Sequence, residues 1–308
     1  MYLEMKDLSK SFDGKEVVSG LNLSMEQGEI LCLLGASGCG KTTTLRMAGG
    51  FLTPDQGRIY LDGEDITALP PEKRPVSTVF QSYALFPHMT VLQNVMYGLK
   101  FQGMKKKEAA RRAAAESALA RAMAVNPKVL LLDEPLSNLD AKLRNRMRDE
   151  LKELQKKTGI TMIFVTHDQE EAMALADKIA IMEGGRLIQM GAPRDVYQNP
   201  SSLFVMEFLG TADKAVMPDG SLLYFRPEDI RILGRKEELE AGEEAGQKTQ
   251  APASRKQLTG VISKSDYMGF YTQYFVETES GEILVREFER EYQPGEAVML
   301  ELQGGKAF

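Results

Sequence analysis

The sequence is short of several residue types, and these shortages narrow the class of protein. Among its 308 residues there is no tryptophan, and there are only two cysteines and two histidines. Cys32 lies in an apolar stretch, and Cys39 lies in the glycine-rich segment that directly follows it. Two cysteines placed in this way are typical of a reduced cytosolic protein and do not form a disulfide framework.

Long apolar runs and an excess of positive charge are also missing. No window approaches the ~20 apolar residues of a membrane-spanning helix. The first residues, MYLEMKD, lack the basic and apolar regions of a secretion signal. The chain has 38 Lys and Arg against 44 Asp and Glu, a net charge of −6, which does not favour a nucleic-acid partner. We therefore expect a cytosolic chain that another protein holds in place if it works at a membrane.

Apolar runs that alternate with helical patterns predict an α/β domain over residues 1–209. Residues 30–34 (ILCLL), 128–132 (KVLLL) and 160–165 are apolar enough to be buried strands of a parallel sheet. Such alternation indicates a doubly wound, mainly parallel sheet. Further strands are expected at 2–11, 17–25, 58–61, 76–80 and 178–182, and helices at 43–47, 91–101, 105–124, 141–157 and 168–175.

The pattern changes after residue 209, where short predicted strands follow one another without helices. They cover residues 222–225, 230–233, 258–263, 271–277, 283–287 and 298–302. Residues 210–308 are therefore expected to form a small β domain, either a barrel or a sandwich. Within it, residues 234–257 are charged and poor in apolar side chains, so we expect a flexible, solvated loop there.

Residues 35–42, GASGCGKT, match the phosphate-loop pattern G-x-x-x-x-G-K-[ST] at every fixed position. A strand before the loop and a helix after it direct backbone N–H groups and a helix N-terminus toward phosphates. We expect ATP or GTP to bind here, with Lys41 neutralising the phosphates and Thr42 ligating Mg²⁺. The predicted phosphate-binding residues are Gly35, Ala36, Ser37, Gly38, Cys39, Gly40, Lys41, Thr42 and Thr43.

Phosphoryl transfer to water also needs a carboxylate near Mg²⁺, a base for the attacking water and a group that senses the γ-phosphate. Asp133 ends an apolar strand and is expected to hold Mg²⁺, and Glu134 is expected to act on water. His167 follows a second apolar strand, so its ring can point into the same crevice as Glu134. Gln81 is a candidate for contact with both Mg²⁺ and the γ-phosphate, and Phe12 for stacking on the adenine.

Together these motifs resemble the ATP-binding subunit of an ABC importer. Residues 35–42 resemble Walker A, 129–134 resemble Walker B, and 137–140 resemble the D-loop. Phe12, Gln81 and His167 are similar to the A-loop aromatic, the Q-loop glutamine and the switch histidine. Residues 226–229 (RPED), followed by short strands, resemble the accessory TOBE domain, and residues 73–88 resemble the polyamine, iron and phosphonate importers.

The resemblance implies a P-loop NTPase fold with an OB-like TOBE domain, and ATP and Mg²⁺ as cofactors. It implies a homodimer or ATPase pair that works with integral membrane permease subunits, without nucleic acid. The chain would then be cytoplasmic and peripheral on the inner face of the cell membrane, where the permease holds it. Glu134 and His167 would be the catalytic residues, and Thr42, Gln81 and Asp133 would contact the metal.

One family motif, the signature L-S-G-G-Q, is missing from the stretch between Gln81 and Asp133. The alanine-rich segment up to Ser117 continues directly into Ala118, so we expect a truncated helical subdomain. Three functions therefore stay open. The chain is the energising subunit of an importer, a degenerate or regulatory protein that binds ATP without hydrolysing it, or a phosphate-loop ATPase that acts on DNA or another protein. The β domain favours the first function over the third.

Overall fold

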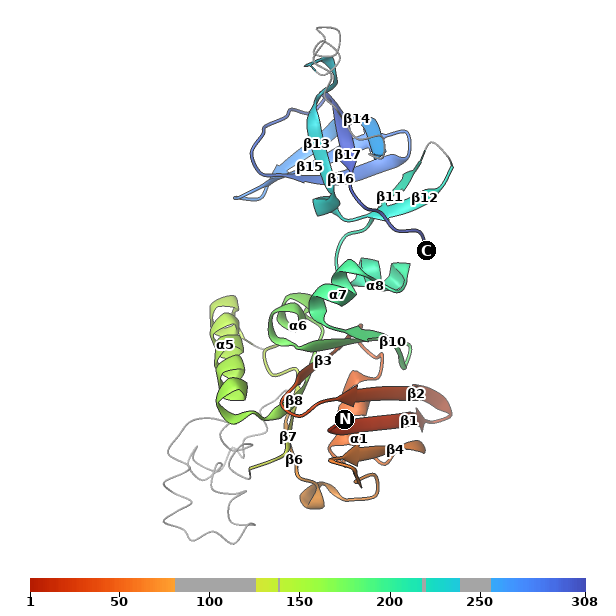
Figure 1. Cartoon of the computed structure of the whole chain (residues 1–308), viewed down its shortest axis with the longest axis vertical. Coiled ribbons are helices and arrows are strands. Elements are labelled where there is room, and N and C mark those ends of the chain that lie inside the picture. The colour runs from red at the N-terminus through yellow and green to blue at the C-terminus, as the bar shows by residue number, and fades with distance from the viewer. Residues whose placement is uncertain (81–125, 138, 218–219, 239–255) are drawn as a thin grey trace. The chain divides into compact units, whose positions relative to one another are not determined.

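The computed structural model describes residues 1–80, 126–137, 139–217, 220–238 and 256–308 (Figure 1). The chain forms two compact units, Met1–Ser201 and Ser202–Phe308. Each unit has a hydrophobic core of its own. In the part of the chain that the structure describes, no helix is long and apolar enough to cross a membrane.

The first unit is built on a six-stranded sheet with the strand order β10-β9-β3-β8-β7-β6. All its neighbours pair in parallel except β10, which is antiparallel to β9. Every residue of β3, β7 and β8 is buried, because both faces of the sheet are covered. The strands are β3 (Ile30–Gly35), β6 (Val76–Val79), β7 (Val129–Asp133), β8 (Thr161–Thr166), β9 (Lys178–Glu183) and β10 (Arg186–Gly191).

A second, antiparallel sheet with the order β2-β1-β4-β5 contributes to the same core. Helix α1 (Lys41–Ala48) contacts strands of both sheets. In β2, Leu21, Leu23 and Met25 are buried and alternate with more exposed residues, as the sequence pattern predicts. The strands are β1 (Leu3–Phe12), β2 (Lys15–Met25), β4 (Gln56–Leu61) and β5 (Glu64–Asp65), and a 3₁₀ turn, η1, covers Pro71–Lys73.

Helices α5 (Ala141–Thr158), α6 (Gln169–Leu175) and α7 (Pro193–Gln198) complete the first unit. Asp140 and Asp168 cap α5 and α6, because each carboxylate accepts a hydrogen bond from the backbone N–H three residues on. Helix α6 contacts β3, β8, α5 and α7. The apolar stripe of α5 is only partly covered, since Leu151 is buried and Leu143 is 39% exposed.

The second unit begins with α8 (Leu203–Phe208) and continues as a β domain. A hairpin of β11 (Asp213–Val216) and β12 (Leu222–Phe225) precedes the turn η2 (Pro227–Asp229) and a five-stranded antiparallel sheet, β13-β17-β14-β15-β16. Buried residues of the hairpin and the sheet share one core. The sheet strands are β13 (Ile230–Arg235), β14 (Lys256–Tyr267), β15 (Thr272–Thr278), β16 (Gly281–Glu287) and β17 (Ala297–Leu302).

Several elements differ from the sequence predictions. The bounds predicted for the loop, residues 234–257, are wrong at both ends, because β13 continues through Arg235 and β14 already begins at Lys256. Pairing with β17 continues both strands into these polar residues. Strands β10 and β11 are not predicted, and β14 is longer than expected. The helices predicted at 91–101 and 105–124, and the centre of the loop, lie outside the described residues.

Candidate nucleotide site

The phosphate loop connects buried β3 to α1, and three glycines allow its path. Gly38 and Gly40 have φ values of 80° and 102°, in the left-handed region that favours glycine. A Cβ atom on Gly40 would lie 2.7 Å from the carbonyl oxygen of Val17, and one on Gly35 would clash with the carbonyl oxygen of Met182. The neighbouring strands therefore leave room only for a bare backbone at these positions.

Lys41 opens α1 and is 6% exposed. Its Nζ donates hydrogen bonds to the carbonyl oxygens of Gly35, at 2.6 Å, and Ala36, at 3.0 Å. The Sγ of Cys39 lies 3.7 Å from the same nitrogen. The ammonium group thus lies inside the curl of the loop, where its charge is held by backbone dipoles.

Two predicted metal-binding residues, Thr42 and Asp133, are in contact. The Thr42 hydroxyl donates a hydrogen bond of 3.1 Å to Oδ1 of Asp133. Asp133 is 8% exposed, and this burial raises the pKa of its carboxyl group, while the Thr42 hydrogen bond partly opposes the shift. A hydroxyl and a carboxylate are hard oxygen ligands of the kind that Mg²⁺ prefers, so the two side chains fit the predicted metal.

The two predicted catalytic residues, Glu134 and His167, also meet. They follow β7 and β8, which are parallel neighbours and end at the same edge of the sheet. Nδ1 of His167 lies 3.3 Å from Oε1 of Glu134. The Glu134 backbone has a φ of 45°, and its N–H donates a hydrogen bond of 3.0 Å to the carbonyl oxygen of Val165.

A hollow of about 200 Å³ lies over the loop. Of the predicted catalytic pair, Glu134 lines the hollow and its side chain is 22% exposed, whereas the His167 ring is 59% exposed and is not among the lining residues. The hollow brings a lysine, two threonine hydroxyls and a carboxylate together with the start of a helix, an arrangement suited to an anion and its metal counterion. Its lining residues are Val17, Ser37, Gly38, Gly40, Lys41, Thr42, Thr43 and Glu134.

The other predicted site residues have different outcomes. Phe12 ends β1 on the hairpin whose second strand supplies Val17 to the hollow. Its ring is 41% exposed, and the Lys10 Nζ lies 5.7 Å from the ring centroid. Gln81 lies outside the described residues, and so does Asn138 of the segment that resembles the D-loop.

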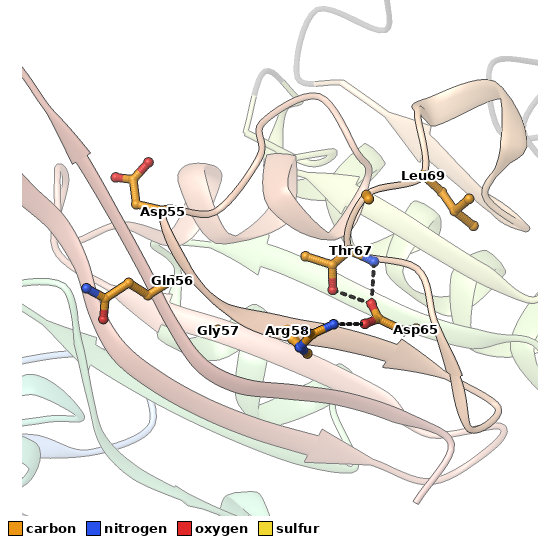
Figure 2. A pocket seen from close by; sticks show the side chains of 8 residues that line it. Asp55, Gln56, Gly57, Arg58, Asp65, Thr67 and Leu69 are labelled. Carbon is orange, nitrogen blue, oxygen red and sulfur yellow. Dashed lines mark hydrogen bonds and ion pairs between the residues drawn. The ribbon is translucent and has the colours of Figure 1, made fainter.

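A second and larger hollow, of about 610 Å³, lies beside β4 (Figure 2). Its charged side chains are paired, either with one another or with Lys10 beside it. Arg58 and Asp65 form an ion pair of 2.6 Å, Thr67 donates to Asp65, and Asp55 pairs with Lys10. None of its lining residues is predicted from the sequence as a site residue, and we assign it no ligand.

Sequence reasoning missed side chains that lie behind the predicted catalytic pair. Arg144 of α5 forms ion pairs with Asp168, at 3.1 Å, and with Glu171, at 3.5 Å. Glu171 is 3% exposed, and its pKa is raised by burial. These partners are far apart in the sequence, so no local pattern connects them. The only local signal is an arginine that follows the D-loop-like segment.

The strand, phosphate loop and helix, with two carboxylates at the end of the parallel strand β7, define a P-loop nucleotide-binding protein. Residues 18–118 match the family described as ABC transporter, and residues 223–308 match the TOBE domain. The chain is 42% identical over 347 residues to the spermidine/putrescine import ATP-binding protein PotA of Vibrio cholerae, with 95% of this chain and 88% of the relative covered. This chain belongs to the ABC transporter family and is an ABC-type ATPase with a C-terminal TOBE domain.

An iron-import relative and solved structures agree with this assignment. The Fe(3+) ions import ATP-binding protein FbpC of Rhizobium etli is 41% identical over 330 residues, with 96% of this chain and 94% of the relative covered. A dimeric ATP-binding cassette bound to ADP and Pi matches with a TM-score of 0.57 and 26% identity, over 62% of this chain and 99% of its own. A dimeric bacterial ABC transporter cassette matches equally well, at 27% identity.

The comparisons also bear on the missing signature. The alignment with the Vibrio relative spans 347 positions, more than the 308 residues of this chain, so the relative has residues that this chain lacks. The match to the ABC transporter family stops at residue 118, where the sequence analysis places the gap. The gap itself lies outside the described residues.

Proposed function

We propose that the phosphate loop binds the phosphates of Mg-ATP through Lys41, Thr42, Thr43 and the backbone N–H groups of residues 35–43. The observation that carries this proposal is the hollow itself, in which Lys41 and the start of α1 face the same space as Glu134. On binding, Lys41 exchanges the carbonyl oxygens of Gly35 and Ala36 for phosphate oxygens. Phe12 stacks on the adenine from the exposed end of β1.

The metal is proposed to be held by Thr42, Asp133 and Gln81. The contact between Thr42 and Asp133 supports the first two. When bound, Mg²⁺ neutralises charge that develops on the phosphate oxygens. The protein's own part is to keep a hydroxyl and an ionised carboxylate side by side in a buried position.

Hydrolysis is proposed to use Glu134 and His167. A water oxygen forms a bond to the γ-phosphorus, the bond from that phosphorus to the bridging oxygen breaks, and the proton of the water passes to the Glu134 carboxylate. His167 holds that carboxylate in place and contacts the γ-phosphate, since its ring nitrogen already lies beside Glu134.

We further propose that the chain energises import of a polyamine or of Fe³⁺, because the similar proteins are import ATP-binding proteins for these solutes. Two ATPase subunits pair, as the dimeric cassettes do, and bind permease subunits at the inner face of the cell membrane. In this proposal residues 1–209 form the ATPase domain and residues 210–308 a TOBE-like domain for dimer contact or solute-dependent regulation.

The metal site is tested by titrating the chain with ATP at increasing Mg²⁺. Thr42→Val and Asp133→Asn should each weaken Mg²⁺-dependent binding and leave metal-free binding nearly unchanged. Thr67→Val is the matched control, because its hydroxyl binds Asp65 in the other hollow. Equal Mg²⁺ dependence in all four proteins would exclude Thr42 and Asp133 as the metal site.

The solute is tested by transport into membrane vesicles that contain the chain and its permease. Uptake of labelled spermidine or putrescine that depends on ATP would support the polyamine class, and uptake of Fe³⁺ would support the iron class. Loss of uptake in Glu134→Gln is the control for coupling to hydrolysis. Uptake of neither solute would exclude both classes.

A further inference from the structure

Arg144 connects three segments that surround the proposed catalytic pair. Its backbone lies in the first turn of α5, and its side chain points to elements that are distant in the sequence. Nη2 donates a hydrogen bond of 3.2 Å to the carbonyl oxygen of Leu139, within the segment that resembles the D-loop. Nη1 donates a hydrogen bond of 3.1 Å to Oδ2 of Asp168, and Nε lies 3.5 Å from Oε1 of Glu171.

Arg144 contacts the carboxylates of Asp168 and Glu171, and hydrogen bonds of these two residues hold Thr166 and Asp168, which flank His167 in the sequence. Oε2 of Glu171 accepts a hydrogen bond of 2.7 Å from the Thr166 hydroxyl, and that hydroxyl accepts one of 3.0 Å from the Asp168 N–H. Oδ1 of Asp168 accepts a hydrogen bond from the Glu171 N–H, which caps α6. Thr166 and Glu171 are both 3% exposed, so the hydrogen bond between them is shielded from water and costly to break, whereas the Arg144 and Asp168 side chains are 33% and 27% exposed.

These contacts form a closed circuit of which Glu134 is a member. Nδ1 of His167 reaches Oε1 of Glu134, and the Ser137 hydroxyl donates a hydrogen bond of 3.0 Å to the Glu134 carbonyl oxygen. The segment that begins at Ser137 returns to Arg144 through the Leu139 carbonyl. Arg144 does not line the hollow over the phosphate loop. Within the described residues, its connection to the site therefore runs through the residues that it holds.

We propose that Arg144 is a positioning residue that holds His167 against Glu134 and couples both to the D-loop-like segment. The kinetic consequence rests on the proposed function, in which Glu134 and His167 hydrolyse ATP. A planar guanidinium suits this place because it binds two carboxylates and a carbonyl in fixed directions, which a lysine ammonium on a flexible stem does not do.

The position of His167 is tested by NMR relaxation of the histidine rings in the full chain. The chain has two histidines, so His88→Gln assigns both signals. In Arg144→Met we expect the His167 ring to gain motion on the nanosecond scale, with partial rescue in Arg144→Lys. Arg146→Met is the matched control, because Arg146 is on the same helix with a 77% exposed side chain paired to Glu150. An unchanged His167 ring in Arg144→Met would overturn the proposal.

Kinetics give a second, separate readout. Arg144→Met should lower kcat for ATP by about 10- to 100-fold with little change in KM, because the loss affects placement and not the phosphate loop. In a His167→Ala background the same substitution should have almost no further effect on kcat. A full additional loss in that background would contradict positioning through His167.

Two outcomes keep the proposals apart. If His167→Ala leaves kcat unchanged, the proposed role of His167 in hydrolysis is wrong, and the ring relaxation still decides whether Arg144 positions it. If Arg144→Met does not fold, Glu171→Gln gives the same test, because it removes one of the charges that Arg144 binds. In that variant a His167 ring as rigid as in the parent would again overturn the proposal.

Discussion

Replacement of Arg74 by methionine should destabilise the first unit strongly, because this guanidinium supports the helix after the phosphate loop. Arg74 is 6% exposed, and it donates four hydrogen bonds of 2.7 to 2.8 Å to carbonyl oxygens of Thr67, Leu69, Met47 and Ala48. The last two residues end α1. Arg74 therefore caps the C-terminus of α1 and ties it to the segment before β6.

The expected magnitude follows from what the methionine leaves behind. A buried carbonyl oxygen that loses its donor costs about 1–3 kcal/mol. The Met47 oxygen keeps a hydrogen bond of 3.2 Å from the Gly50 N–H, so at most three such losses remain. They are partly offset because the desolvation cost of a buried guanidinium disappears as well. We expect Arg74→Met to lower the free energy of unfolding by about 3 kcal/mol, a net value smaller than the sum of the separate losses.

The assay is urea unfolding followed by circular dichroism, since the chain has no tryptophan to report by fluorescence. Arg58→Met is the matched control, because Arg58 forms an ion pair with Asp65 while its own side chain is 65% exposed. An exposed pair of this kind contributes about 0–1 kcal/mol. Equal stability of Arg74→Met and Arg58→Met would refute the reasoning about α1.

Three further predictions concern the second unit, the base and the gap. Burial raises the pKa of Asp213 to about 6, above its ordinary 3.8, so its protonation stabilises the fold at low pH, and this contribution is lost as the pH rises through about 6. Relative to the parent, Asp213→Asn should gain up to about 3 kcal/mol of unfolding free energy between pH 4 and pH 7. Parallel pH profiles of the two proteins in urea unfolding would contradict the burial of this charge. Glu134→Gln should retain ATP affinity and lose about 10²–10⁴ in turnover, and a rate equal to the parent's would move the base elsewhere. Insertion of a family-like segment with L-S-G-G-Q between Ser117 and Ala118 should increase ATP-dependent dimerisation, measured by sedimentation, and the ATPase rate, by about 10²–10³ for each electrostatic donor restored; a rate unchanged by the insertion would show that the motif is not what limits this chain.

Much of the site could be predicted because its residues are adjacent in the sequence to strongly apolar strands. The runs ILCLL and VLLL are strands β3 and β7, and the ends of parallel strands bring Asp133 and Glu134 to the phosphate loop. The contact between Glu134 and His167 follows from the same rule, since β7 and β8 are neighbours.

What could not be predicted depends on contacts between distant residues. The separate antiparallel sheet requires β1 to pair with β4, and no local pattern specifies that partner. Arg74 and Arg144 resemble ordinary surface arginines in the sequence, and only the fold shows that they bind buried carbonyl and carboxylate oxygens. The amphipathic stripe of α5 predicts more burial than the described structure gives it.

The central claim, that the hollow over the phosphate loop binds Mg-ATP, is tested most directly by a calorimetric titration of Lys41→Ala. A charge-assisted hydrogen bond is worth about 1.5–3 kcal/mol, and Lys41 gives up two carbonyl contacts in exchange for phosphate, so Kd should rise by about 10- to 100-fold. Lys128→Ala is the control, since this lysine pairs with Asp62 on the surface. We predict weakened binding in Lys41→Ala alone; equal affinity for Mg-ATP in both variants and the parent would contradict the account.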